Sequence, residues 1–205
     1  GLVAVFDAGS TRSYPGTGST WYNLIGTVNG TLSASSIGTT TAGTMTFDGV
    51  DDSIDIPLTS ATNLFTVIGV TQRTNAAAGR LISGKNNNWL LGQWSSYMRQ
   101  YFAAGWVTGV GAGGGYTTDD LQTHIWCGTG NVSGNAYRFR DDNVEYTTTT
   151  TSGTSGPSGF ILGAYGPGGP AEYGTGTITV LLVYNRVLTD AEINQNYNAQ
   201  KTRFL

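Results

Sequence analysis

The chain has 205 residues, of which only 11% are charged, and its formal net charge is −3. Because an average globular protein has about 25% charged residues, most solvent-facing positions here must be neutral and polar, or glycine. The few cations form no basic stripe, so nucleic acid is not an expected partner, and no run approaches the roughly 20 apolar residues of a membrane-spanning helix, so membrane insertion is not expected either.

Short apolar segments recur along the whole chain, separated by clusters of Gly, Asn, Asp and Ser. Such spacing is typical of a β-sandwich or barrel. In SIDIP, the apolar Ile54 and Ile56 alternate with polar neighbours such as Asp55, which predicts a strand with one buried face. In chain order, the predicted strands are residues 2–6, 44–49, 53–57, 65–73, 79–84, 88–94, 97–103, 124–131, 136–141, 143–150, 159–165 and 177–185. This length fits one all-β domain over residues 1–205.

The turns between these strands have suitable chemistry. Asp141, Asp142 and Asn143 predict a tight hairpin, since Asp and Asn tolerate a left-handed backbone. Residues 109–116 and 166–176 are glycine-rich and predict loops. The first of these lacks the Lys-Ser/Thr pair of a phosphate-binding loop, so a nucleotide site is not expected.

Several residues are assigned to the interior. Cys127 is the single cysteine, so an internal disulfide is excluded, and its apolar setting predicts a buried residue without a chemical role. The neighbouring Trp126 is assigned to the core. Trp21 is expected to fix the first loop.

The last segment has the signals of a helix start. Thr189 is the predicted N-cap, and Glu192 three residues later completes a capping box. Leu188 and Ile193 are placed to form the accompanying hydrophobic contact. About three turns of such a sequence would not be stable alone in water.

The predicted helix must therefore dock on the sandwich through Ile193 and Tyr197, its strongest apolar residues. The preceding strand, 177–185, is almost continuously apolar, as expected of a strand that is buried on both faces. We expect the helix to close an end or an edge of the sandwich.

These closing residues resemble the last segment of the concanavalin A-like lectin/glucanase superfamily, in its laminin-G-like branch. The matching residues are Gly176, Ile178, Tyr184, Asn185 and Arg186, followed by the capping box. MTFDGVDDSIDIP (45–57) is similar to the family's Phe-Asp-Gly segment, and residues 63–74, 80–84 and 159–168 are similar to its following strands. The resemblance implies a two-sheet antiparallel jelly-roll sandwich with one short C-terminal α-helix.

The opening, residues 5–26, resembles the first segment of such domains in tailed-bacteriophage virion proteins. This implies a place on a virion surface, or otherwise outside the cell. The implied partners are a host-surface glycan, other virion proteins or further copies of the chain. Because one fold serves many functions, the resemblance specifies the fold better than the function.

Catalysis is not expected from the carboxylates. Glucanases of the superfamily carry a Glu-x-Asp-x-x-Glu strand, and sugar hydrolysis generally needs two carboxylates about 5–10 Å apart. The three glutamates, Glu145, Glu172 and Glu192, do not form this pattern. No Ser or Asp motif beside His124 indicates a triad. We therefore expect no enzyme and no catalytic residue.

The segment DGVDDSID contains four aspartates, Asp48, Asp51, Asp52 and Asp55, whose oxygens suit Ca²⁺. The glycine and terminal glutamate of an EF-hand loop are missing. The alternative is a turn in which Asp48 accepts backbone N–H groups and Asp52 orients the next strand. No cofactor is required in either case, and Ca²⁺ stays a candidate because relatives of this fold sometimes bind it near a rim.

Aromatic and amide side chains suggest a sugar site. Aromatic faces beside polar groups suit the C–H faces of sugars, and few charges are needed. The candidates are Trp89, Trp94, Tyr97, Trp106, Tyr116, Asn87 and, from a second glycine-rich and proline-rich loop, Tyr165. The alternative is that these rings fill the core or pack across strands.

The sequence thus favours a non-enzymatic virion-surface module, as capsid decoration or fibre, that binds host carbohydrate for adhesion. The first alternative is a purely structural decoration protein without glycan binding, which the low charge and the Thr-rich segment 143–154 suit equally well. A divergent glycosidase is the third hypothesis.

Overall fold

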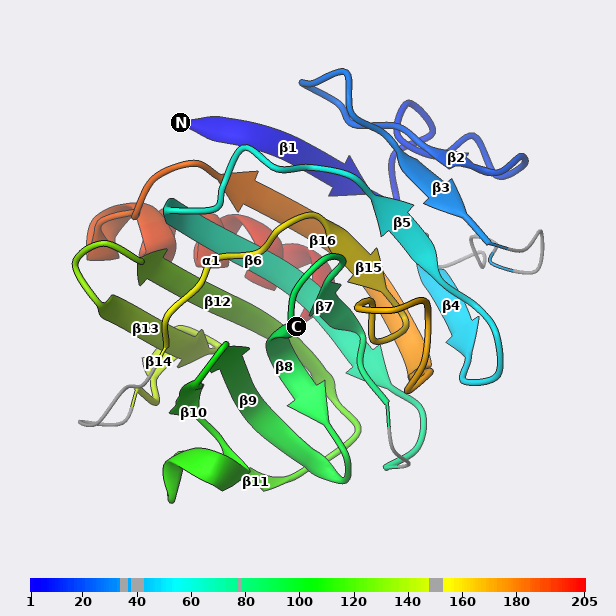
Figure 1. Ribbon diagram of the computed structural model, residues 1–205. Coiled ribbons are helices and arrows are strands. Elements are labelled where there is room, and N and C mark those ends of the chain that lie inside the picture. Colours follow the sequence, from blue (N-terminus) through cyan, green and yellow to red (C-terminus); the bar gives the residue numbers. More distant parts are fainter. Residues whose placement is uncertain (34–36, 38–42, 77–78, 148–152) are drawn as a thin grey trace.

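The computed structural model describes residues 1–33, 37, 43–76, 79–147 and 153–205. Within these residues the strands form a seven-stranded and a nine-stranded sheet that face each other. Figure 1 shows the nine-stranded sheet in front, the seven-stranded sheet behind it and helix α1 (Asp190–Phe204) at the back. The prediction of a two-sheet antiparallel jelly roll with one C-terminal helix is confirmed.

The seven-stranded sheet is built around three long central strands. Its order is β1 (Leu2–Asp7), β16 (Thr175–Tyr184), β6 (Leu64–Arg73), β12 (Thr123–Asn131), β13 (Ala136–Asp141) and β14 (Val144–Glu145), with β4 (Met45–Asp48) paired to the other end of β16. The predicted hairpin turn is confirmed, since Asp142 and Asn143 both have positive φ and join β13 to β14.

The nine-stranded sheet consists of shorter strands. Its order is β10 (Trp106–Thr108), β9 (Tyr97–Ala103), β8 (Trp89–Trp94), β7 (Ile82–Gly84), β15 (Phe160–Leu162), β5 (Ile54–Ile56), β3 (Gly30–Leu32) and β2 (Thr20–Trp21), with β11 (Thr117–Thr118) paired to β9. The sequence did not predict β2, β3, β10 and β11, because strands of two or three residues are too short to show an alternating pattern. The predicted loop 109–116 contains a 3-10 turn, Val110–Ala112. Residues 148–150 of the predicted strand 143–150 lie outside the described residues.

One apolar core fills the space between the two sheets. Ile54 and Ile56 face it, as their alternation predicts. Trp126 and Trp21 are fully buried there, and Trp21 packs against Phe6 with ring centroids 5.3 Å apart. Trp126 is therefore in the core as predicted.

A second, smaller core lies between helix α1 and the back of the seven-stranded sheet. It combines Ile193 of the helix with Val180 and Leu182 of β16, and it includes Cys127. Burial raises the pKa of the Cys127 thiol to about 12, which keeps it protonated. Strand β16 is thus buried on both faces, as predicted, but the helix covers the outer face of the sheet and not an end or edge. The reason is that β6, β12 and β16 all present apolar residues on that face.

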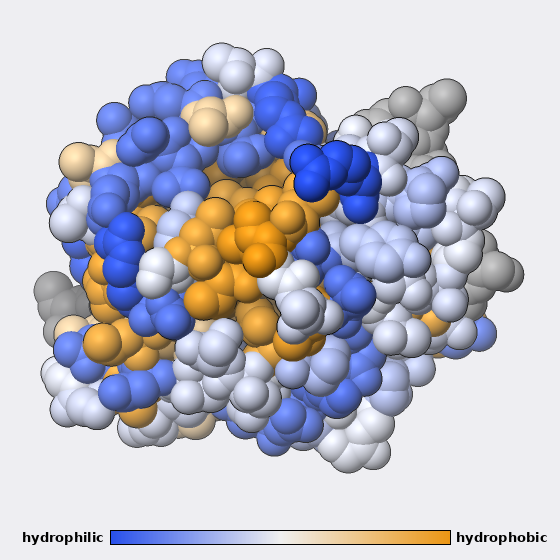
Figure 2. Space-filling view, turned by 90° about the horizontal axis from the view of Figure 1, so that it is seen from above, coloured by the Kyte–Doolittle hydropathy of each residue, from blue (hydrophilic) through white to orange (hydrophobic). Residues whose placement is uncertain are grey.

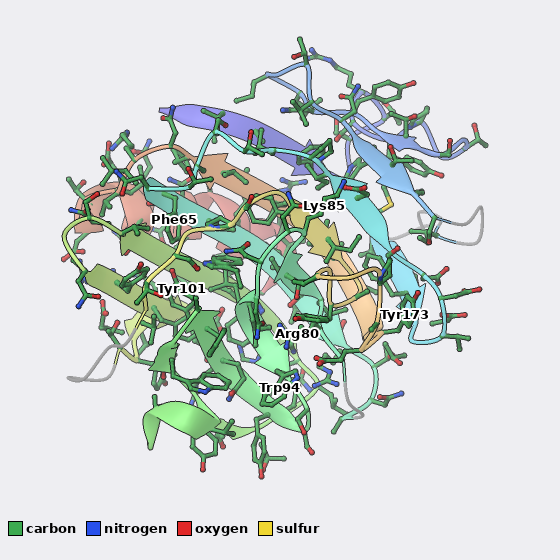
Figure 3. The ribbon with its side chains drawn as sticks, in the orientation of Figure 1. Phe65, Arg80, Lys85, Trp94, Tyr101 and Tyr173 are labelled. Atoms are coloured by element: carbon green, nitrogen blue, oxygen red, sulfur yellow. The ribbon has the colours of Figure 1, made fainter. Side chains whose placement is uncertain are left out.

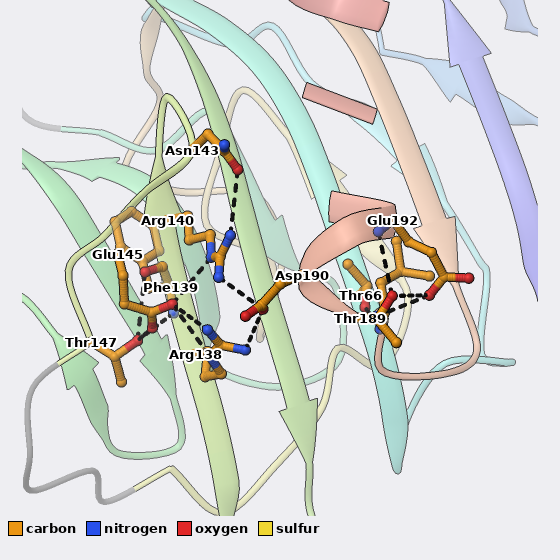
Figure 4. A network of polar contacts seen from close by, with 11 residues as sticks. Thr66, Arg138, Phe139, Arg140, Asn143, Glu145, Thr147, Thr189, Asp190 and Glu192 are labelled. Carbon is orange, nitrogen blue, oxygen red and sulfur yellow. Dashed lines mark hydrogen bonds and ion pairs between the residues drawn. The ribbon is translucent and has the colours of Figure 1, made fainter. Parts of the chain in front are cut away.

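The helix begins with the predicted capping box, in which Thr189 Oγ1 accepts the Glu192 N–H and the Glu192 carboxylate accepts the Thr189 N–H. Hydrogen bonds from Arg186 and Thr189 lower the pKa of Glu192 to about 2. Figure 4 shows the polar contacts around this start. Arg138 and Arg140 of β13 both donate to Asp190 Oδ1, at 2.7 and 2.8 Å. The helix N-terminus is therefore tied to the neighbouring strand as well as to its own turn.

The surface beside β1 carries exposed apolar side chains. Apolar side chains gather on the side of the molecule that carries β1, seen from above in Figure 2, and Leu2 and Ile25 are among the exposed ones. The free edge of β1 is partly covered by Asn23, whose side chain bonds the backbone of Val3 and Val5. The described residues contain no helix with the length and apolar character that crossing a membrane requires.

Candidate functional site

A groove of about 600 Å³ lies on the outer face of the nine-stranded sheet. Its floor includes Ile161 of β15, which pairs with Asp55 of β5 on one side and with Ser83 of β7 on the other. Directly paired residues point to the same face of a sheet. One wall is the loop 166–170, and the opposite wall comes from β3 and Ser33. The size is within the usual range of ligand pockets.

The groove combines an apolar floor with polar groups at its rim. Ile161 and Pro167 supply apolar surface, and the hydroxyls of Thr31 and Ser33 and the amide of Asn86 line the sides. The groove also contains the ion pair of Lys85 with Asp55, in which Nζ lies 2.6 Å from Oδ2. Both side chains of this pair are partly exposed.

The wall loop is held by contacts below and beside it. Gly166 lies so close to the turn after β7 that a Cβ there would be 2.6 Å from the Gly84 carbonyl oxygen. At the other end of the loop, the Glu172 carboxylate accepts hydrogen bonds from Arg80 Nε at 2.8 Å and from Trp94 Nε1 at 3.0 Å. Figure 3 shows Arg80, Trp94, Lys85 and Tyr173 from separate segments around this loop. Glu172, which has a positive φ, is thus held by two side chains, Arg80 and Trp94.

Arg80 is the centre of these contacts. Its guanidinium also donates to Asn88 at 2.8 Å and lies 4.5 Å from the ring centre of Tyr165. The candidate Tyr165 therefore packs on a cation at the base of the loop. The sequence gives no local signal for Arg80, Lys85 or Ile161, because strand pairing between distant segments brings them together.

The structure corrects the prediction made for Trp89. It was a candidate for sugar contact, but its side chain is fully buried and faces the space between the sheets. Its ring lies 5.6 Å from that of Tyr101 and 5.9 Å from that of Phe160. The odd-numbered residues of β8 point inward, so Trp89 is a core residue and cannot touch a ligand on the sheet surface.

Trp94 and Trp106 lie on the outer face, both half-buried. Their ring centres are 5.8 Å apart, and the Trp106 ring is 5.1 Å from Phe102. Together with Arg80 and Leu90, these rings line a small cleft of about 90 Å³ on the other side of the wall loop from the groove. Sugar contact by these two candidates stays a prediction.

The remaining sugar candidates lie elsewhere. Tyr97 and Tyr116 form an edge-to-face pair, with centres 5.2 Å apart, where β9 meets β11. The Asn87 amide donates to Ser155 Oγ and the Gly156 carbonyl oxygen, and its oxygen accepts the Ser158 N–H. Asn87 is thus used to hold a loop, and its neighbour Asn86 is the one that faces the groove.

The aspartate segment is divided by the fold. Oxygens of Asp48, Asp51 and Asp52 lie within 4.8 Å of one another, whereas Asp55 is in the groove beside Lys85. Asp48 accepts the Val50 N–H at 2.8 Å, and the Asp52 carboxylate accepts the Asp48 N–H at 3.1 Å. The predicted turn is present, and Asp55 lies apart from the three aspartates that come together, at which Ca²⁺ binding stays a prediction.

His124 lies in an ion cluster that the sequence did not indicate. Its Nδ1 is 2.7 Å from Asp141 and 3.2 Å from Asp142, and its Nε2 is 3.0 Å from Asp120. The ring stacks on Trp126. Burial disfavours the charged form, but the hydrogen bonds to Asp141 and Asp142 outweigh it and raise the pKa of His124 to about 11.

Comparison with known proteins identifies the fold. No model of a protein family and no curated protein matches the sequence. Trypanosoma rangeli sialidase in complex with sialic acid matches 100% of this chain and 34% of its own, with a TM-score of 0.69 and 15% identity. A mutant of that sialidase with trans-sialidase activity matches with a TM-score of 0.67 and 17% identity. A third match is domain 4 of a GH43 extracellular arabinanase from Geobacillus stearothermophilus, in complex with arabinotriose. It covers 95% of this chain and 97% of its own, with a TM-score of 0.55 and 17% identity.

The chain is a β-sandwich like those in glycan-acting proteins. It spans about a third of the length of the sialidases that it matches. The prediction that the chain is not an enzyme is contradicted, because solved structures similar to the whole chain are sialidases. At 15–18% identity these matches extend to the fold alone. The comparisons give no support to a phage origin.

Proposed function

We propose that this chain binds carbohydrate in the groove on the outer face of the nine-stranded sheet, as a β-sandwich module of a protein that acts on glycans or adheres to them. The observation that carries the proposal is the groove of about 600 Å³, with Ile161 in its floor and hydroxyl and amide groups at its rim. An apolar surface bordered by a few polar groups suits a sugar ring.

A similar structure also supports carbohydrate binding by this fold. An arabinanase domain with this fold was solved with arabinotriose. Weak binding at a single groove would be raised by several copies on one surface.

Binding is tested on a glycan array and then by calorimetry with the oligosaccharides that bind. Asn86→Ala removes an amide from the groove and should weaken binding. Asn198→Ala is the matched control, because Asn198 is exposed on α1, behind the other sheet. Release of free sugar, measured in the same samples, separates binding from turnover. Equal affinities of the two variants would place the site elsewhere, and no binding to any glycan would refute the proposal.

A place on a virion surface, beside other virion proteins or further copies of this chain, is a second part of the proposal. It rests on the resemblance of residues 5–26 alone. Immunogold labelling of particles from a host that carries this sequence tests it, and label found only away from particles would contradict it.

A further inference from the structure

We infer that the groove selects uncharged glycans over acidic ones such as sialic and uronic acids. This inference rests on the proposed function, since it names the class of sugar for the same groove.

Lys85 is the one cation among the described residues that line the groove, and it is already paired. Its Nζ lies 2.6 Å from Asp55 Oδ2, with both side chains partly exposed on the groove surface. The pair is fixed by strand pairing, because Asp55 is on β5 next to Ile161 and Lys85 follows β7 at the end of the adjacent ladder. The groove is therefore neutral overall, and Asp55 is the only carboxylate among the described residues that line it.

The next cation on the same side of the sheet is Arg80, and it is also committed. It is buried, and its donors are directed at Glu172 and Asn88. A carboxylate on a sugar is held best by a free guanidinium that donates two parallel hydrogen bonds. Neither Arg80 nor Lys85 can do this without breaking an existing ion pair.

An acidic sugar would also pay a larger free-energy cost than a neutral one on entering the groove. Its carboxylate must give up water and then lies near the like charge of Asp55. A neutral sugar avoids both costs, because Thr31 and Asn86 at the rim can exchange hydrogen bonds with hydroxyl groups without any charge. The balance favours neutral glycans.

The test uses an array on which each neutral glycan is printed beside its sialylated or uronic-acid counterpart, followed by calorimetry of the strongest pairs. The wild-type protein should bind the neutral member about tenfold more tightly or better, which is about 1.4 kcal/mol. Equal or tighter binding of the acidic member would overturn this inference and leave the proposed function standing. Binding of neither, across the whole array, would overturn both.

Two variants identify the ion pair as the cause. Asp55→Asn releases Lys85 and removes the like charge, so the preference for the neutral member should fall by about tenfold. Lys85→Gln removes the cation and leaves the carboxylate, so the preference should become stronger. Circular dichroism confirms that each variant is folded. Unchanged selectivity in a folded Asp55→Asn protein would refute the role of the pair.

Discussion

The ion cluster around His124 makes stability depend on pH in a specific direction. The pKa of His124 is raised from its ordinary value to about 11 by Asp141 and Asp142. The folded protein therefore keeps this proton in a range where the unfolded chain, with an ordinary imidazole pKa of about 6.5, loses it. The contribution is fully present below about pH 6.5 and decreases as the pH rises toward 11.

Because one proton separates the two states, the free energy of unfolding should fall by about 1.4 kcal/mol per pH unit in this range. From about pH 7 to about pH 8.5 the loss is about 2 kcal/mol. The measurement is kept below about pH 8.5, the ordinary pKa of a thiol. Above it the raised pKa of Cys127 also makes the free energy of unfolding fall with pH. Urea unfolding at several pH values measures the slope. In His124→Gln the slope should disappear, even though the variant is less stable overall.

A second readout is direct. His124 is the single histidine, so its imidazole resonances in the NMR spectrum can be followed without assignment, and they should not titrate between about pH 6 and about pH 9. The Asn198→Ala variant, which leaves His124 and its three aspartates unchanged, serves as the control and should keep the wild-type slope. Parallel slopes for wild type and His124→Gln, or a midpoint near that of a free imidazole, would refute this reasoning.

Three further predictions follow from burial and local contacts. Trp89→Ala should lower the free energy of unfolding by about 3–5 kcal/mol, and half-buried Trp94→Ala by clearly less; equal losses in urea titrations would contradict the assignment of Trp89 to the core. Glu172→Ala should cost only about 1–2 kcal/mol but weaken glycan binding several-fold, because the wall loop loses its anchor; calorimetry showing unchanged affinity would separate the loop from the site. Thr189→Ala should cost about 1 kcal/mol through the lost helix cap, while Thr189→Ser should be nearly neutral; the same unfolding assay compares them.

The features that the sequence predicted correctly depend on neighbouring residues. Apolar alternation placed Ile54 and Ile56 toward the core, and Asp142 with Asn143 formed a hairpin because both tolerate positive φ. The start of α1 was predictable for the same reason, since a capping box needs only residues three apart.

The sequence could not decide which aromatic residues reach the surface. In β8 and β9 both faces carry large apolar side chains, so alternation does not distinguish inside from outside. A bulge at Arg99, which has a positive φ, shifts the register against β8. As a result Tyr97 points outward while Tyr101, four residues later, is buried in the core.

The groove was likewise decided by tertiary structure. Asp55, Lys85, Ile161 and the wall loop 166–170 come from distant parts of the chain, and only the order of β5, β15 and β7 brings them together. Local patterns specify strands, turns and caps, because their interactions span a few residues. Which strands become neighbours is fixed by burial over the whole sandwich, and the site follows from that pairing.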